Sequence, residues 1–224
     1  MLYKKMEALQ FKIQRESHRS VMDVFGPGPH YVRITFELPT DNNNNNNNDN
    51  DNKDPASLSS FVVEMAPISM MPHSVHVFLE QVAHGLWTGG KFNINAPHVL
   101  QVDPGRFKAF KDQKLATLAF QEYHASYPHK KYTLGMAGRP AGPSFYVNKM
   151  DNVANHGPGG QGHHVLEEEG EPCFARVVSG FQALNAVAAR PVKGSRFLLD
   201  QPVLVTSTVL LPREYVPPDE KPPK

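Results

Sequence analysis

The chain has 224 residues, of which 40% are hydrophobic and 20% are charged, and its formal net charge is +1. This composition predicts a globular protein with one substantial domain and shorter appendages. The near-neutral charge argues against general electrostatic binding of nucleic acid, and no apolar stretch reaches the roughly 20 residues of a membrane span. The single cysteine, Cys173, cannot form an internal disulfide and is expected to be a buried apolar residue.

Residues 1–25 form the first segment, which the spacing of its apolar residues predicts to be helical. Leu2, Met6, Leu9 and Ile13 recur at helical intervals between charged and polar residues. Two heptads are too few for a stable coiled coil on their own. The segment is therefore either the stub of a coiled coil through which the chain self-associates or a helix docked on the domain. It lacks the apolar core of a secretory signal, so the cytoplasm is the default location.

Two strands are predicted next, on either side of an asparagine-rich run. Residues 30–39 alternate between apolar and polar side chains, and residues 59–67 form a second strand-like run. Residues 41–57 between them include DNNNNNNNDNDN, which cannot bury apolar surface and is predicted to be a disordered loop.

The rest of the chain contains short strand-like runs and two amphipathic segments. The predicted helices are residues 70–87 and 181–189; the apolar or alternating runs are 91–102, 115–123, 130–138, 143–148, 172–178 and 201–211, with a polar, basic excursion at 105–114. Many short strands at close spacing favour a closed barrel or a sandwich, with the two helices covering its ends. Residues 212–224 are proline-rich and polar and are predicted to be a disordered tail.

Five sequence blocks, in order, resemble the cyclophilin-type peptidyl-prolyl isomerases. The first, MPHSVHVFLEQVAHGLWTGGKF, is similar to the family's proline-led helix, glycine turn and phenylalanine. HVLQ is similar to the strand that ends in glutamine, and YTLGMAG to the leucine–small–methionine–alanine segment. GPSFYVN is similar to the aromatic strand, and PCFARVVSGFQALNAV to the late strand and second helix.

The resemblance covers residues 30–211 and implies a mainly β fold. This is a closed eight-stranded antiparallel barrel capped by two helices, here with an extra N-terminal helix. It also implies isomerase (rotamase) activity in protein folding, which rotates the slow bond before proline in peptide or protein segments. No cofactor is required. Such catalysis needs a groove for proline and a fixed donor that favours the twisted amide.

The family's groove residues can be carried over by position. Residues that match are Phe92, Gln101, Met136, Ala137, Phe145 and Tyr146. Asn93 occupies the usual histidine place, and Glu171 falls near another position where a groove histidine is usual. Ile94 stands where the resemblance implies the catalytic arginine, so no catalytic residue is identified.

The side chain of isoleucine cannot donate a hydrogen bond. Isoleucine in place of the expected arginine therefore bears on whether the domain is an active isomerase. It predicts isomerase activity that is weak or lost, unless Arg106 or Arg139 supplies the donor from a neighbouring turn. The alternatives are a catalytically silent module for protein interaction and a structural protein that oligomerises through residues 1–25.

The eleven histidines also raise the question of a metal site. His156, His163 and His164 precede Glu167–Glu169, and these residue types can ligate zinc. Their spacing matches no compact motif, and glycines separate them. A solvated loop without a metal is therefore predicted.

Overall fold

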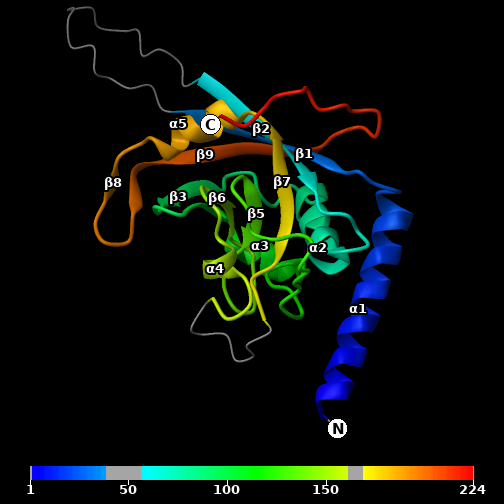
Figure 1. Cartoon of the computed structure of the whole chain (residues 1–224). Coiled ribbons are helices and arrows are strands. Elements are labelled where there is room, and N and C mark those ends of the chain that lie inside the picture. Colours follow the sequence, from blue (N-terminus) through cyan, green and yellow to red (C-terminus); the bar gives the residue numbers. More distant parts are fainter. Residues whose placement is uncertain (1, 39–56, 161–168, 224) are drawn as a thin grey trace, which may run out of the picture.

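The computed structural model describes residues 2–38, 57–160 and 169–223 (Figure 1). The helices in these ranges are α1 (Leu2–Val24), α2 (Pro72–Ala83), α3 (Phe107–Asp112), α4 (Val153–His156) and α5 (Phe181–Ala188). The strands are β1 (Tyr31–Leu38), β2 (Ser57–Met65), β3 (Lys91–Asn95), β4 (Val99–Asp103), β5 (Thr133–Met136), β6 (Phe145–Asn148), β7 (Cys173–Ser179), β8 (Val192–Lys193) and β9 (Leu198–Leu210). None of the described helices combines the length and apolar character needed to cross a bilayer.

Eight antiparallel strands form a closed barrel. Their order is β1-β2-β7-β5-β6-β4-β3-β9, and a pairing between β1 and β9 closes the ring. The short β8 pairs with β9 beside this ring. The predicted mainly β fold, with its closed eight-stranded antiparallel barrel, is confirmed.

Several local predictions differ from the structure. Residues 115–123, expected as an apolar or alternating run, belong to no strand, and the polar excursion at 105–114 contains the short helix α3. Phe110 of this helix is fully buried and packs edge-on against Trp87 at 5.1 Å, which explains why a basic segment becomes helical there. The asparagine-rich loop lies, apart from Ser57, outside the described residues.

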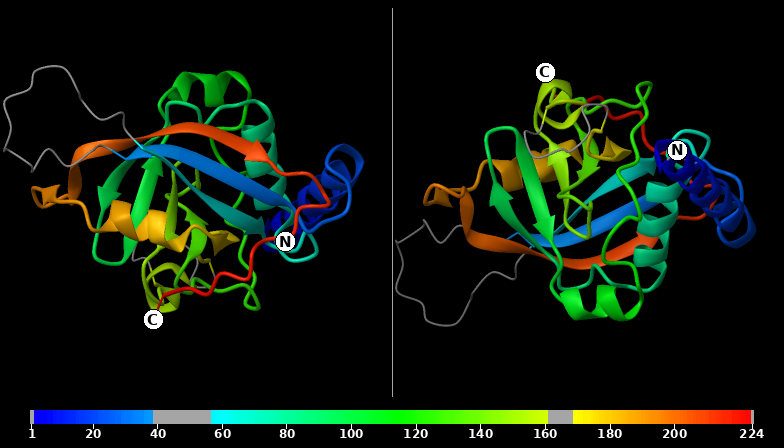
Figure 2. Two further views of the ribbon diagram at one scale, coloured as in Figure 1. Left: turned by 90° about the horizontal axis from the view of Figure 1, so that it is seen from above. Right: turned by 90° about the horizontal axis from the view of Figure 1, so that it is seen from below.

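The barrel interior is closely packed with aromatic side chains. Phe78 of α2 contacts Trp87, Phe145 and Phe174, with ring centroids 4.8 to 6.2 Å apart. Cys173 is also buried, as expected from the sequence. Helices α2 and α5 lie on opposite sides of the barrel strands (Figure 2). Their apolar faces thus complete the core that the strands enclose.

Helix α1 extends away from the barrel, and the contacts described next attach its C-terminal half (Figure 1). Val21 is fully buried, Ser17 Oγ lies 3.2 Å from His73 Nδ1, and Gln14 donates to Glu122 at 3.1 Å. The first half of the helix leaves large apolar side chains exposed. These are Leu2, Tyr3, Met6, Leu9 and Phe11.

Glu122 links this helix to the barrel. Its carboxylate is 1% exposed and also accepts hydrogen bonds from the amides of His73 (3.1 Å) and Ser74 (2.7 Å) in the first turn of α2. Burial raises the pKa of Glu122, although these amides oppose the rise. The residue before α2 provides no side-chain cap, so Glu122 satisfies amides that the helix leaves free.

The proline-rich C-terminal segment, for which the sequence predicts disorder, lies along the barrel in the structure. Tyr215 packs on Tyr31 at 5.3 Å, and Arg213 donates to the Phe25 carbonyl at 3.2 Å. Glu220 accepts hydrogen bonds from the amides of Gly180 and Phe181 at the start of α5. These contacts hold the segment without an apolar core of its own.

Glu122→Ala should lower the free energy of unfolding by about 1–3 kcal/mol, because two buried amides and the Gln14 amide lose their acceptor. Urea unfolding would measure the change. Glu7→Ala, at an exposed position on α1, is the matched control and should change stability little. Equal effects of the two substitutions would contradict the role assigned to Glu122.

Candidate functional site

The residues carried over from the resemblance fall on two neighbouring rows of the barrel wall. Cross-strand pairing aligns Phe92 with Val102, Val102 with Phe145, and Phe145 with Met136. All four side chains are at most 1% exposed and belong to the main core. Three of the expected groove residues, Phe92, Met136 and Phe145, therefore lie inside the barrel.

The adjacent row, called here the outer row, consists of Ile94, Gln101, Tyr146 and Gly135. Ile94 pairs with Gln101, Gln101 with Tyr146, and Tyr146 with Gly135. Successive side chains of a strand point to opposite faces, so the row next to a core row faces away from the core. A bulge between Phe92 and Ile94 leaves Asn93 out of the pairing and brings Ile94 into this row.

Tyr146 is the centre of a small second apolar cluster on this face. Ala96 and Val99 form the cluster with it, and Ile94 and Ala137 pack against it. Gly135 makes room for the tyrosine, since a Cβ at this position would lie 2.4 Å from the ring. Ile94, Ala137 and Tyr146 are thus together, and Gln101 is paired with two of them.

Asp103 orients the polar side chains at one end of the outer row. Its Oδ1 accepts hydrogen bonds from Gln101 Nε2 at 2.7 Å and Ser144 Oγ at 2.8 Å, and its Oδ2 accepts from Asn93 Nδ2 at 3.1 Å. The glutamine amide is therefore held along the strand by a charge-assisted hydrogen bond.

Glu171 approaches the other side of Tyr146 from the segment that precedes β7. Tyr146 Oη donates to Glu171 Oε2 at 2.5 Å, and His156 Nδ1 lies 2.8 Å from the same oxygen. All three residues are at most 5% exposed. Burial and the neighbouring carboxylate raise the pKa of Tyr146 well above its usual value.

The carboxylate of Glu171 is held in its charged form. Burial alone would raise its pKa, but the hydrogen bonds with His156 and Tyr146 outweigh burial and lower the pKa. His129 also contacts this residue, because its Nε2 lies 2.8 Å from the Glu171 carbonyl. Sequence reasoning placed Glu171 near a groove position but did not predict its bonds to these side chains, which come from separate loops and strands.

His129 is buried and neutral. Its Nε2 faces a carbonyl acceptor, and its Nδ1 lies 3.4 Å from the amide nitrogen of Asn148. Burial lowers the pKa of His129 from 6.5 to about 4. Asn152 extends the network with a 2.7 Å hydrogen bond to Asn148. This polar network holds Glu171, whose carboxylate accepts the hydrogen bond of the Tyr146 hydroxyl.

Three cationic side chains could in principle replace the donor that Ile94 lacks, and two of them, Arg139 and Lys149, are bonded to other groups. Arg139 forms an ion pair with Glu169 in the region that faces α1, and Arg106 is exposed immediately before α3. Lys149 follows β6, and its Nζ donates to Asn95 Oδ1 at 2.8 Å and to the Ala96 carbonyl at 2.9 Å. Arg139 and Lys149 thus donate to Glu169, Asn95 and Ala96, and neither donates at the position of Ile94.

The histidine-rich segment, for which the sequence predicts a loop without a metal, lies mainly outside the described residues, which exclude His163, His164, Glu167 and Glu168. Within the described ranges, no group of three or more histidine, cysteine, aspartate or glutamate side chains is arranged to hold a metal ion.

The sequence matches no protein family model and no curated protein. The structure is similar to that of a cyclophilin-type peptidyl-prolyl cis-trans isomerase of Cryptosporidium parvum, with a TM-score of 0.55, 15% identity, and coverage of 82% of this chain and 98% of that chain. A second structure of that isomerase, in the presence of the dipeptide Ala-Pro, gives a TM-score of 0.53 and 16% identity over 81% of this chain and 99% of that one.

Acidification should destabilise the fold through His129. The unfolded state binds a proton near pH 6.5 and the folded state only near pH 4, so the stabilisation is complete above pH 6.5 and is lost as the pH falls toward 4. Between pH 7 and pH 5 this loss is about 2 kcal/mol, and His129→Gln should reduce it. Urea unfolding at pH 7 and pH 5 measures this loss in the free energy of unfolding. The control His18→Gln, at an exposed position, should keep the full loss. An unchanged pH dependence in His129→Gln would show that His129 has no such role.

The closed barrel, the two helices that cover it and the likeness to these structures establish that the chain is a divergent domain with the cyclophilin fold.

Proposed function

We propose that the chain binds proline-containing peptide segments at the outer row and its surroundings, with weak or absent peptidyl-prolyl isomerase activity. The observation that carries this proposal is Ile94, which pairs with Gln101 in a barrel of the cyclophilin fold. The apolar surface around Tyr146 and the fixed amide of Gln101 suit the apolar ring and carbonyl groups of a proline segment. Ile94, Gln101 and Ala137, which are partly exposed, are the proposed contact residues, and the buried Tyr146 supports them.

The same geometry supports the expectation of weak catalysis. Rotation about the prolyl bond is faster when a fixed donor stabilises the state in which amide resonance is lost. Ile94 has no donor, the amide of Gln101 is bonded to Asp103, and the hydroxyl of Tyr146 is bonded to Glu171. A segment bound here would meet few free donors, so a catalytically silent binding module is the limiting case of this proposal.

An isomerase assay on an X-Pro peptide tests the proposal. The unchanged chain should show little activity, and Ile94→Arg should raise it by about tenfold or more, because removal of a comparable donor from enzymes costs about 10²–10³ in rate. Ile94→Met, similar in length but without a donor, is the control. Activity of the unchanged chain at the level of an efficient isomerase would contradict the role given to Ile94.

Self-association through α1 is the second candidate function. Leu2, Met6 and Leu9 share one face of the helix half that extends from the barrel, and they are 82%, 37% and 58% exposed. Apolar side chains at this spacing suit pairing with the same helix of another copy. This candidate is compatible with peptide binding, because the outer row lies on other elements.

The double substitution Leu2→Glu and Leu9→Glu should convert a dimer to a monomer in analytical ultracentrifugation, since both side chains lie on one face of the helix and would be buried in the pair. Residues 14–24, which attach α1 to the barrel, remain intact in this variant. Lys4→Glu and Lys12→Glu change exposed positions on the same helix and serve as the control. A monomer before any substitution excludes this candidate.

A further inference from the structure

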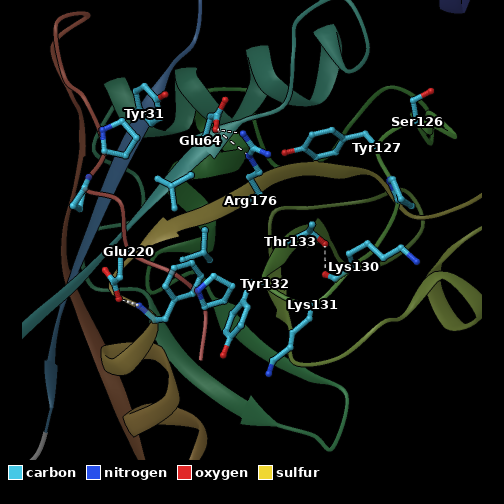
Figure 3. Close-up of a pocket in the computed structure, with 17 residues that line it drawn as sticks. Tyr31, Glu64, Ser126, Tyr127, Lys130, Lys131, Tyr132, Thr133, Arg176 and Glu220 are labelled. Carbon is cyan, nitrogen blue, oxygen red and sulfur yellow. Dashed lines mark hydrogen bonds and ion pairs between the residues drawn. The ribbon is translucent and has the colours of Figure 1, made fainter. Parts of the chain in front are cut away.

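A cavity of about 720 Å³ lies between the barrel and the C-terminal segment (Figure 3). Its barrel side comes from β1, β2, β7 and the loop before β5, and so from a different part of the wall than Ile94 and Gln101. Figure 3 shows Glu64, Arg176 and Tyr127 together, Tyr132 and Lys131 in another part, and Glu220 to one side. The lining therefore combines aromatic rings with charged side chains.

Residues 212–223, called here the tail, form the opposite wall. Pro217, Pro218 and Pro222 line the cavity, and Pro223 lines a second cavity of about 180 Å³ with Tyr132. Tyr132 lines both cavities and packs edge-on against Phe181, which lines the larger one, with ring centroids 4.9 Å apart. Aromatic-lined grooves are a common way to bind proline-rich segments, because prolines preorganise an extended backbone.

Glu220 is the polar anchor of the tail. Its carboxylate accepts hydrogen bonds from the amides of Gly180 at 2.8 Å and Phe181 at 3.2 Å. Gly180 is the N-cap of α5 and has no side chain to cap the helix. The tail thus offers the helix start a negatively charged acceptor, which both the free amides and the helix dipole favour.

The tail fills this site only in part. The open cavity beneath it means that Pro217, Pro218 and Pro222 lack packing partners on one side. Val216, between Tyr215 and Glu220, is 81% exposed. A segment held by three small contacts, those of Arg213, Tyr215 and Glu220, over unfilled space can be displaced by one that fills the space better.

We propose that this cavity is a second peptide site, specific for proline-rich segments that carry an acidic residue, and that the tail occupies it within the same chain. A partner segment displaces the tail and places its own carboxylate on the amides of Gly180 and Phe181. The proposal is independent of the outer row, because it uses other residues and requires no isomerase activity.

The test uses the full chain and a labelled peptide with the sequence of residues 215–223, YVPPDEKPP. Glu220→Gln removes the charge that anchors the tail, so the peptide should bind this variant about tenfold more tightly than the unchanged chain, by fluorescence anisotropy. Glu214→Gln, a substitution at an exposed tail carboxylate, is the matched control and should behave like the unchanged chain.

Two peptide variants and one spectroscopic measurement define the site. Replacing the glutamate of the peptide with glutamine, or its four prolines with alanine, should weaken binding to Glu220→Gln by about tenfold or more. The amide resonances of Gly180 and Phe181 should shift when the peptide binds. The proposal would be overturned if the peptide bound the unchanged chain, Glu220→Gln and Glu214→Gln with equal affinity. It would also be overturned if the peptide substitutions left the affinity unchanged, or if only the resonances of Gln101 and Tyr146 shifted. Thermal unfolding confirms that each variant is folded.

Discussion

The pairing of β1 with β9 is the constraint on which the rest of the structure depends. β9 spans Leu198–Leu210 and pairs with β1, β3 and β8, so it joins the two ends of the strand order. Closure gives every strand one face toward the core and one away from it. Phe92, Val102, Phe145 and Met136 thereby become a single interior row, and the neighbouring row becomes an outer surface. The separation of core from candidate site is a consequence of this closure and needs no special feature of the individual side chains.

The spacing of short strands, such as the alternating run at residues 30–39, left a closed barrel and a sandwich open, and the resemblance carried by ordered blocks such as HVLQ selected the barrel. The sequence was less informative about the site. Alternation requires Phe145 and Tyr146 to face opposite ways, yet both were assigned to the groove through the resemblance. The bulge at Asn93 could not be derived from residue types, since it depends on the register with β4. Gly135 was the available signal, because a glycine inside a strand often marks a close approach, here that of the Tyr146 ring.

The polar network behind Tyr146 bears on the proposed function. A carboxylate with a lowered pKa, a tyrosine hydroxyl and two imidazoles could be taken for acid–base machinery. Their hydrogen bonds are instead directed at one another: Tyr146 and His156 both contact the same oxygen of Glu171, and His129 contacts its carbonyl. A buried network whose groups bond to one another stabilises one arrangement and leaves few donors for a substrate. This geometry agrees with a surface that binds a segment rather than one that accelerates its rotation.

The two ends of the chain are attached by the same physical device. Helices α2 and α5 both begin without a side-chain cap, and in each case a distant glutamate accepts hydrogen bonds from two amides at the helix start. Local sequence cannot reveal such a cap, because Glu122 and Glu220 lie about 40 to 50 residues from the amides they satisfy. Their surroundings differ: Glu122 is 1% exposed, whereas Glu220 is half-buried beside an open cavity. Water can replace an acceptor only where it has access, so the hydrogen bonds of Glu220 are easier to exchange than those of Glu122, as displacement of the tail by a partner segment requires.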